Sequence, residues 1–256
     1  MKLKTLRTSL AVGLLVITAG YATQAIAVPS FTFTEYGGFS VDIPVGVDYS
    51  GPVLGTIPPL PVVTPIFSTM SWVSGSSPQS SLVLSTETGP TALPSGVWTR
   101  ISTLTHNNVV IPTAFNWSGQ DVQGRFILTD TDGPATVRLN SDEAITLDFV
   151  ETPNVATCPP PNPNGSTCDD FFSFTAVGLN DLFFTANDGT NWLAEFRLGN
   201  LSNATQIGST VYTAESMSSS LDVEVRISQV PEPATLALLG VGLLGLSLSR
   251  QRRLNG

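Results

Sequence analysis

The single histidine is the residue of this sequence best suited to proton transfer. His106 lies in Leu104–Asn108, at the end of a predicted strand. A Ser-His-Asp triad would have to use it, but no G-x-S-x-G nucleophile elbow accompanies it. The alternative is that His106 and Asn108 satisfy backbone groups where a strand meets a loop. We favour this structural interpretation, and the sequence presents no convincing catalytic constellation.

Several carboxylates are spaced so that they could bind calcium. Asp130-Thr-Asp132-Gly133 resembles the start of a calcium loop but lacks the distal Glu of an EF-hand. Asp169-Asp170 and Asn187-Asp188 offer further oxygen ligands. For each pair, a turn or hairpin cap is a simpler interpretation than a calcium ligand. The sequence therefore predicts no cofactor or metal site, with calcium left open.

A pair of acids for glycoside hydrolysis is a further alternative. It could be drawn from a group of acids close in sequence, namely Asp142, Glu143, Asp148 and Glu151. Linear spacing does not show the separation that such chemistry needs. A secreted hydrolase acting on polysaccharide thus remains the second hypothesis for the body of the chain.

The elements that must position these residues are predicted to be strands. Short alternating segments recur between residues 28 and 230, separated by turn signals at Asp132–Pro134, Asn187–Gly189 and Gly199-Asn200. The clearest is Ser220–Ser228, in which Leu221, Val223, Val225 and Ile227 face one way. Leu139–Glu143 resembles a turn, and the proline-rich segment Gly51–Pro65 a long irregular loop. We predict one all-β domain, an antiparallel β-sandwich of jelly-roll type.

The amino terminus has the features of a secretory signal peptide. Lys2, Lys4 and Arg7 precede an apolar segment, Leu10–Gly20. Ala25-Ile-Ala27 forms an A-x-A cleavage site before Val28. Residues 1–27 are therefore predicted to be a signal helix that is removed on export.

The carboxyl terminus has three parts in a fixed order. Val230-Pro231-Glu232-Pro233 is expected to stay extended, exposed and outside any sheet, because proline lacks an N–H. The uncharged run Ala234–Ser249 follows, and as a helix its 16 residues would span about 24 Å, somewhat less than a bilayer core. Arg250, Arg252 and Arg253 would then remain in the cytoplasm and stop transfer. Residues 230–256 thus predict a membrane anchor with a processing motif.

This tripartite tail resembles the PEP-CTERM sorting signal of Gram-negative bacteria. The resemblance implies recognition by an exosortase, a membrane cysteine transpeptidase that would cut near Pro231–Pro233. The helix would hold the body at the outer face of the inner membrane until that step. The domain boundaries we predict are a signal peptide at 1–27, an exported body at 28–229 and a sorting signal at 230–256.

Export bears on the two cysteines. Cys158 and Cys168 bracket nine residues that include four prolines and a glycine. Outside the cytoplasm such a pair predicts a disulfide. A metal site would need more ligands than two thiols, and no third is nearby in sequence.

A second resemblance rests on short motifs within the body. Thr105-His106-Asn107-Asn108 is similar to the T-H-x-N signature of the THxN family of PEP-CTERM proteins. Glu151-Thr-Pro-Asn154, the cysteine loop and Asp169–Phe172 are similar to its downstream pattern. The resemblance implies an exported β domain with no established reaction, so Thr105, His106 and Asn108 are family markers here.

The charge of the body excludes some partners. Between residues 28 and 229 the chain has 19 acidic residues, five arginines and no lysine. Such a surface repels nucleic acid and anionic membranes. We therefore expect a structural, adhesive or glycan-associated protein of the cell surface or extracellular matrix, with exopolysaccharide as a candidate partner. A calcium-dependent adhesin is a third hypothesis, and a groove lined by Trp98, Trp117 or Trp192 would favour glycan binding.

Overall fold

The body of the protein is built from strands. A computed structural model describes residues 28–40, 46–53, 66–72, 79–87, 89–111, 115–155, 157–158, 160–176, 180–231 and 238–243. Its strands are β1 (Phe31–Ser40), β2 (Val47–Val53), β3 (Ile66–Trp72), β4 (Ser80–Thr86), β5 (Thr91–Leu93), β6 (Thr99–Asn107), β7 (Asn116–Asp130), β8 (Thr136–Val150), β9 (Asp170–Ala176), β10 (Leu182–Thr185), β11 (Asn191–Ser202), β12 (Ala204–Ile207), β13 (Thr210–Thr213) and β14 (Ser218–Gln229). In this part of the chain the only helical residues are 238–243. The all-β prediction is confirmed.

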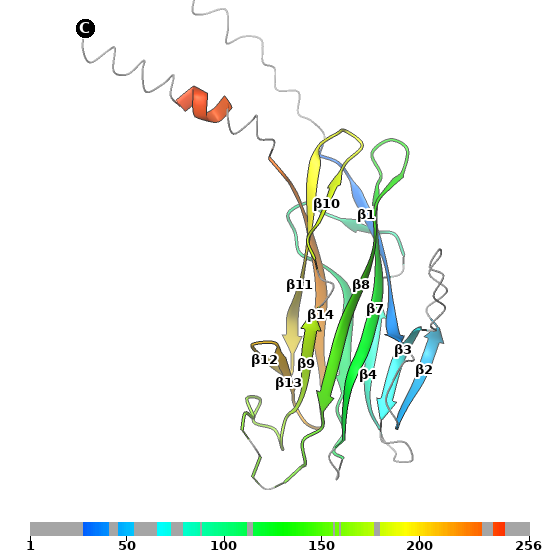
Figure 1. The fold of residues 1–256 in the computed structure, drawn as a ribbon, viewed down its shortest axis with the longest axis vertical. Helices are drawn as coiled ribbons and strands as arrows, with labels where there is room; N and C mark the ends of the chain where they lie inside the picture. The colour runs from blue at the N-terminus through cyan, green and yellow to red at the C-terminus, as the bar shows by residue number, and fades with distance from the viewer. Residues whose placement is uncertain are drawn as a thin grey trace, which may run out of the picture.

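All fourteen strands belong to one antiparallel hydrogen-bonded sheet. Its order is β10-β11-β14-β6-β4-β3-β1-β7-β8-β9-β13-β12, with β2 added to β3 and β5 to β1. The sheet curls into a long body, and its two halves lie face to face (Figure 1). β12 reaches β11 and β14, while β10 reaches β8, so strands distant in the order meet again. The sandwich-like packing thus comes from a single curled sheet.

Two apolar clusters fill the body along its long axis. One joins the first half of β1 to β11 and β14 through Phe31, Phe33, Trp192 and Val225. The other joins the end of β1 to β3, β7 and β8, and it contains Phe39, Met70, Trp72, Leu82, Leu84, Leu104, Ile111, Trp117, Leu147, Phe149 and Phe172. Six of the twelve largest fully buried side chains are aromatic, and aromatic rings contribute the most apolar area per residue to such cores.

The alternation predicted for the last strand is present along its whole length. Leu221, Val225 and Ile227 of β14 are buried, and Val223 packs against the same core. A register shift between Val223 and Glu224 opposite β6 marks a β-bulge. The extra residue of this bulge is Ile101 of β6, so β14 itself is continuous. Glu224 lies on the other face of β14, where it is buried and binds Arg197 at 2.7 Å.

Three predicted irregular segments differ in the structure. Leu139–Glu143 is not a turn, because β8 continues through it, with Asn140 opposite Ile127 and Asp142 opposite Arg125 of β7. Pairing with a continuous neighbour overrides the low strand propensity of these polar residues. Gly199-Asn200 lies in a bulge of β11 and is not a hairpin turn. The part of Gly51–Pro65 that the structure describes, up to Val53, belongs to β2.

The chain enters and leaves the body at the same end. β1 begins and β14 finishes beside the β7–β8 and β10–β11 hairpins (Figure 1). Thr131 N donates to Ser30 O, and Val230 N donates to Asn191 O at 2.8 Å. We call this the tail end, and the opposite end of the body the distal end.

The predicted terminal helices fall mostly outside the described residues. This applies to residues 1–27 with Ala25 and Ala27, to Glu232 and Pro233, and to Arg250, Arg252 and Arg253. Of Ala234–Ser249 the structure describes a six-residue helix, 238–243. No helix among the described residues combines the length and apolar character needed to cross a bilayer.

Candidate metal centre

Three buried carboxyl groups meet at the distal end. Glu151 directly follows β8, Asp170 is the first residue of β9, and Glu215 comes two residues after β13. Their side chains bring one oxygen each to within 4.8 Å of one another. The three residues are 1%, 0% and 5% exposed. We call Glu151, Asp170 and Glu215 the carboxylate cluster.

Strand pairing brings these residues together. β9 lies between β8 and β13, with Val150 opposite Phe171 and Thr213 opposite Asp170. Glu151 and Asp170 are thus held at the ends of adjacent strands, and the turn after β13 returns Glu215 to the same place. The sheet register therefore fixes the cluster.

Each acid accepts a hydrogen bond on one oxygen only. Trp72 Nε1 donates to Glu151 Oε2 at 3.4 Å, Thr152 N to Asp170 Oδ1 at 2.8 Å, and Asn154 Nδ2 to Glu215 Oε1 at 3.2 Å. The second oxygens, Glu151 Oε1, Asp170 Oδ2 and Glu215 Oε2, are buried and have no hydrogen-bond partner. An unpaired buried acceptor is costly, and three in one place are unusual in a folded protein.

Two asparagine side chains complete the surroundings of the cluster. Asn108 is 4% exposed and donates through Nδ2 to Ala214 O at 3.4 Å. Asn154 donates through Nδ2 to Ile111 O as well as to Glu215. The amide oxygen of each is buried without a partner. Five unpaired oxygens, from five residues, therefore lie at this end of the body.

Burial raises the pKa of all three acids of the carboxylate cluster. Desolvation raises the pKa of Glu151, and the negative charges of Asp170 and Glu215 raise it further. Desolvation also raises the pKa of Asp170, opposed by the hydrogen bonds from Thr152. The pKa of Glu215 rises to about 7 for the same primary reason, while the side chains of Asn154 and Asn108 act in the opposite direction. Asn108 thus faces both Asp170 and Glu215.

The arrangement can hold a positive charge but cannot reach a large external substrate. Its negative charge can be balanced by a cation or by protons, and both would occupy the unpaired oxygens. Four arginines of the described body pair elsewhere: Arg100 with Glu87, Arg138 with Asp130, Arg197 with Glu224, and Arg226 with Glu195. General acid–base catalysis on a polymer would require at least one acid to be accessible.

His106 lies beside this cluster, within the distal core. Its ring stacks on Trp72, with centroids 5.5 Å apart, and meets Phe172 edge-to-face at 4.9 Å. Nδ1 is 2.9 Å from Thr213 Oγ1. Burial lowers the pKa of His106 to about 3, so the imidazole is neutral. Ser219 of β14 lies opposite His106, but its hydroxyl donates to Asn203 O at 2.7 Å and not to the imidazole. His106 bonds a side-chain hydroxyl and not a backbone group, whereas Asn108 bonds the backbone oxygen of Ala214.

Thr105, His106 and Asn108 of the T-H-x-N segment lie in three different surroundings. Thr105 lies in β6 between Val83 of β4 and Ser220 of β14. His106 fills the core, and Asn108 faces the carboxylate cluster. Glu151 and Asn154, from the second motif, face the same cluster, which brings together residues that are more than 40 positions apart.

The cysteine loop supports the neighbouring acid. Cys158 and Cys168 form the predicted disulfide. Within the loop, Asp169 accepts from Asn164 N at 2.7 Å and from Ser166 Oγ. Both oxygens of Asp169 are therefore used inside the loop, in contrast to those of Asp170.

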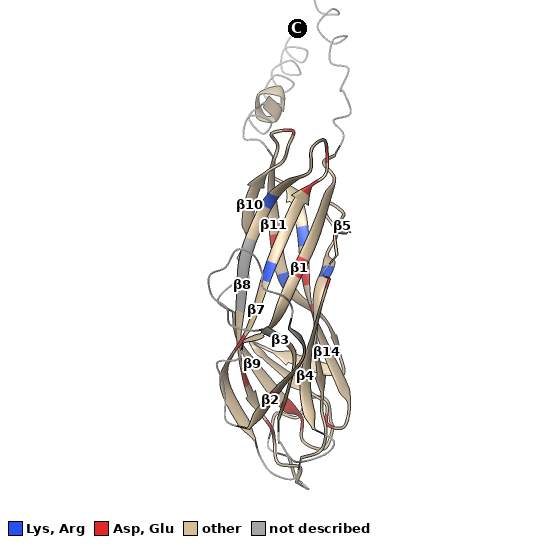
Figure 2. Cartoon of the chain, turned by 90° about the vertical axis from the view of Figure 1, so that its right-hand side faces the viewer, with Lys and Arg blue, Asp and Glu red and all other residues tan. Residues whose placement is uncertain are grey.

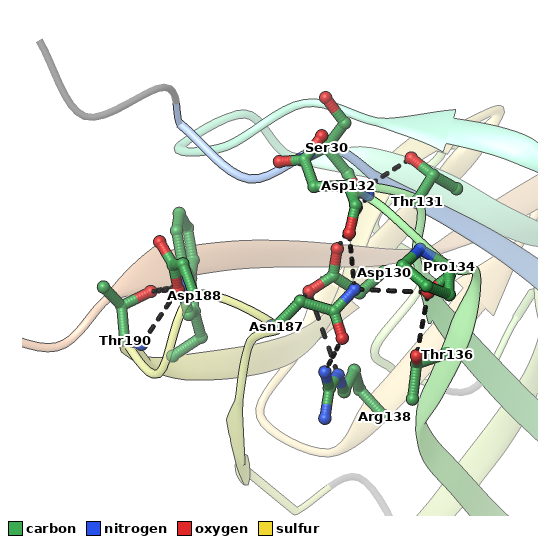
Figure 3. A network of polar contacts seen from close by, with 11 residues as sticks. Ser30, Asp130, Thr131, Asp132, Pro134, Thr136, Arg138, Asn187, Asp188 and Thr190 are labelled. Carbon is green, nitrogen blue, oxygen red and sulfur yellow. Dashed lines mark hydrogen bonds and ion pairs between the residues drawn. The ribbon is translucent and has the colours of Figure 1, made fainter.

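The other calcium candidates are satisfied by the protein. At the tail end Asp130 is fully buried and accepts from Asp132 N at 3.0 Å and from Asn187 N at 2.6 Å, with Arg138 Nε 3.8 Å away (Figure 3). Arg138 also donates to Asn187 Oδ1. Asp188 accepts from the backbone and hydroxyl of Thr190. These residues are hairpin caps, as the alternative interpretation predicted.

The remaining candidates do not form a site at a groove. Asp148 accepts from Gly119 N at 2.9 Å, and the side chains of Asp142 and Glu143 lie outside the described atoms. Trp117 and Trp192 are core residues, 4% and 1% exposed. Trp98 is half-buried and stacks against two guanidinium groups, with Arg197 4.1 Å and Arg226 4.6 Å from its ring centroid. Trp117 and Trp192 therefore do not line an exposed groove, so these two residues do not meet the condition stated for glycan binding.

Sequence reasoning missed Glu215 and Trp72. Glu215 lies in Thr213-Ala-Glu215-Ser, which has no ligand spacing or motif. The only local signal is an acid directly after a predicted strand. Its role depends on the pairing of β13 with β9, which the local sequence does not reveal.

The tail itself begins where the sheet stops. β14 ends at Gln229, Val230 N makes one further backbone hydrogen bond to Asn191 O, and the exposed Pro231 has no N–H with which to continue. The sequence model of the PEP-CTERM protein-sorting motif matches residues 229–253. No curated protein shows significant similarity to the chain. The chain carries a PEP-CTERM sorting motif, which marks it as an exported protein processed by an exosortase-type enzyme.

Proposed function

We propose that the exosortase-processed body becomes a structural or adhesive component of the cell surface or extracellular matrix. The observation that carries this proposal is the position of the sorting motif directly after β14, where the chain leaves the body. β14 delivers the chain to Pro231 at the tail end, and the motif match begins at residue 229. Cleavage at Pro231–Pro233 would release the whole sheet without breaking any strand.

The geometry also supports a defined orientation before cleavage. Both chain ends leave the body at the tail end (Figure 1). The distal end, with the carboxylate cluster, therefore points away from the membrane while the tail is intact. Basic segments lie on the part of the strands towards the tail, and the distal end in this view shows only acidic ones (Figure 2). An acidic distal end would remain soluble and exposed to matrix polymers.

The hydrolase alternative has less support. It requires two acids at an accessible cleft, whereas the acids that do meet are no more than 5% exposed. Burial of this kind suits a structural role. The resemblance to the THxN family remains a prediction and agrees with a non-enzymatic surface domain.

The test follows the full chain in its native host. Wild type is compared with Glu232→Gln, which alters the motif, and with Glu195→Gln, a matched change on β11. Mass spectrometry of matrix and membrane fractions should find wild type and Glu195→Gln in the matrix with a new carboxyl terminus near residues 231–233. Glu232→Gln should accumulate in the membrane with Gly256 intact. Wild type recovered from the matrix with Gly256 intact would contradict the proposal.

A further inference from the structure

The distal end of the body brings together buried side-chain oxygens of the kind that bind metal ions. We propose that Glu151, Asp170 and Glu215, together with the amide oxygens of Asn108 and Asn154, bind one calcium ion. The site is independent of the sorting fate of the protein. It would join the end of β6, the end of β8, the start of β9 and the turn before β14.

The spacing of the oxygens fits a single ion. Ca²⁺ holds its oxygen ligands at about 2.3–2.6 Å, so two ligands on opposite sides are separated by no more than roughly 5 Å. The cluster oxygens of Glu151, Asp170 and Glu215 all lie within 4.8 Å of one another. They can therefore contact a common centre without a change of backbone.

The types of donor select a hard cation. Three carboxylates and two amides provide oxygen only, which is the set that calcium prefers. The imidazole of His106 is not among the grouped ligand atoms, and the two cysteines are joined in a disulfide. A zinc site would draw on nitrogen or sulfur ligands instead. Five protein oxygens also leave space for one or two waters in a calcium shell.

The unpaired atoms provide a second, independent argument. Asn108 is 96% buried, faces Asp170 and Glu215, and has an Oδ1 with no hydrogen-bond partner. Asn154 Oδ1 and one oxygen of each acid are in the same condition. An asparagine that only needed hydrogen bonds would not require an unpaired oxygen in a buried acidic site. One cation held between the three acids would satisfy their unpaired oxygens.

The alternative occupant is protons. Desolvation raises the pKa values of the acids, so an empty cluster would hold protons near neutral pH. Calcium would replace them and restore the negative charges that bind it. This competition is what an experiment must resolve.

Trp72 offers a direct spectroscopic test. Its indole N–H donates to Glu151, so an ion in the cluster would lie beside the ring. Tb³⁺ replaces Ca²⁺ at oxygen sites and emits when a neighbouring tryptophan is excited. The full chain, purified in detergent, should show saturable tryptophan-sensitised terbium emission at about one ion per chain, which excess Ca²⁺ reverses.

Variants assign the signal to the site. Glu215→Gln keeps the oxygen that accepts from Asn154, and Asp170→Asn keeps the shape of the side chain; either should weaken calcium at least tenfold. Trp72→Phe should remove most of the emission while calcium binding, followed by calorimetry, persists. Asp188→Asn is the matched control, because this acid lies at the tail end and its hydrogen bonds are with Thr190, and its calcium affinity should stay within threefold of wild type.

Two results would overturn the proposal. One is the absence of saturable Ca²⁺ binding by the folded wild-type chain at millimolar concentration, which would leave protons as the occupant. The other is binding that is unchanged in both Glu215→Gln and Asp170→Asn. Circular dichroism confirms that each variant is folded, and if Asp170→Asn fails to fold, Glu215→Gln decides the result.

Discussion

The two ends of the body handle buried acids in opposite ways. At the tail end Asp130 is fully buried, and two backbone N–H groups and Arg138 satisfy its carboxylate. At the distal end Asp170 is equally buried, but one of its oxygens has no partner and its nearest charges are two other acids. Both oxygens of the buried acid at the tail end have protein donors, whereas each of the three acids at the distal end keeps one oxygen without a donor. Burial of an acid therefore does not by itself indicate a site; the balance of donors does.

The largest expected effect comes from breaking the tail end. Asp130→Ala removes the acceptor for two backbone N–H groups and leaves Arg138 without its acid. Loss of one partner of such a buried network costs about 4 kcal/mol of unfolding free energy. Chemical denaturation should show the same loss in calcium and in EDTA. A loss that appears only in calcium would mean that the two ends are coupled.

The second-largest expected effect is a dependence of the free energy of unfolding on pH, caused by Glu215 at the distal end. Burial raises the folded-state pKa of Glu215 from 4.5 to about 7. Its protonated form favours the folded state, so the associated stability is complete below pH 4.5 and is lost as the pH rises through 7. The loss is on the order of 3 kcal/mol at the usual conversion per pKa unit.

The measurement compares wild type with Glu215→Gln in EDTA, because the glutamine does not titrate. The wild-type free energy of unfolding should fall relative to the variant between pH 4.5 and 7. Saturating calcium should abolish this relative fall, since the ion favours the ionised acid. A relative stability that rises with pH in EDTA would show that donors absent from the described contacts satisfy Glu215.

Removing the disulfide beside Asp170 should have a smaller effect, confined to the distal end. Cys158 and Cys168 close a short loop next to Asp170, and releasing such a loop costs about 2–3 kcal/mol. The double variant Cys158→Ser/Cys168→Ser should lose that stability and also bind calcium more weakly, because the loop orders the start of β9. The Asp130 network should be unaffected, which hydrogen exchange at Asn187 N can check. Unchanged calcium affinity would show that strand pairing alone positions Asp170.

The sequence predicts the strands better than the site. Alternation identifies β14, and the turn signals at Asp132–Pro134 and Asn187–Gly189 mark the two hairpins of the tail end. The turn predicted at Leu139–Glu143 was wrong, because pairing with β7 makes this segment part of a strand. Local motifs marked Asn108, Glu151 and Asp170 separately, but nothing local marked Glu215. Their meeting depends on the registers of β8, β9 and β13, which are long-range pairings.

The smallest expected effect comes from His106, and its dependence on pH has the opposite sign. Burial lowers the pKa of His106 to about 3, so its neutral form favours the folded state. Stability from this residue is present above its ordinary pKa of 6.5 and is lost as the pH falls towards 3. Between pH 6.5 and 5 the loss is about 2 kcal/mol.

The check compares wild type with His106→Phe, which keeps a ring between Trp72 and Phe172 but cannot titrate. Wild type should lose stability relative to the variant as the pH falls from 6.5 to 5, in the same range where protonation of Glu215 favours folding. Calcium binding should persist in His106→Phe, because His106 supports the core and not the ion. Loss of calcium binding in that variant would make the imidazole part of the site. The opposite pH dependences of His106 and Glu215 would then belong to one coupled group, and not to a neutral core residue next to a separate acid.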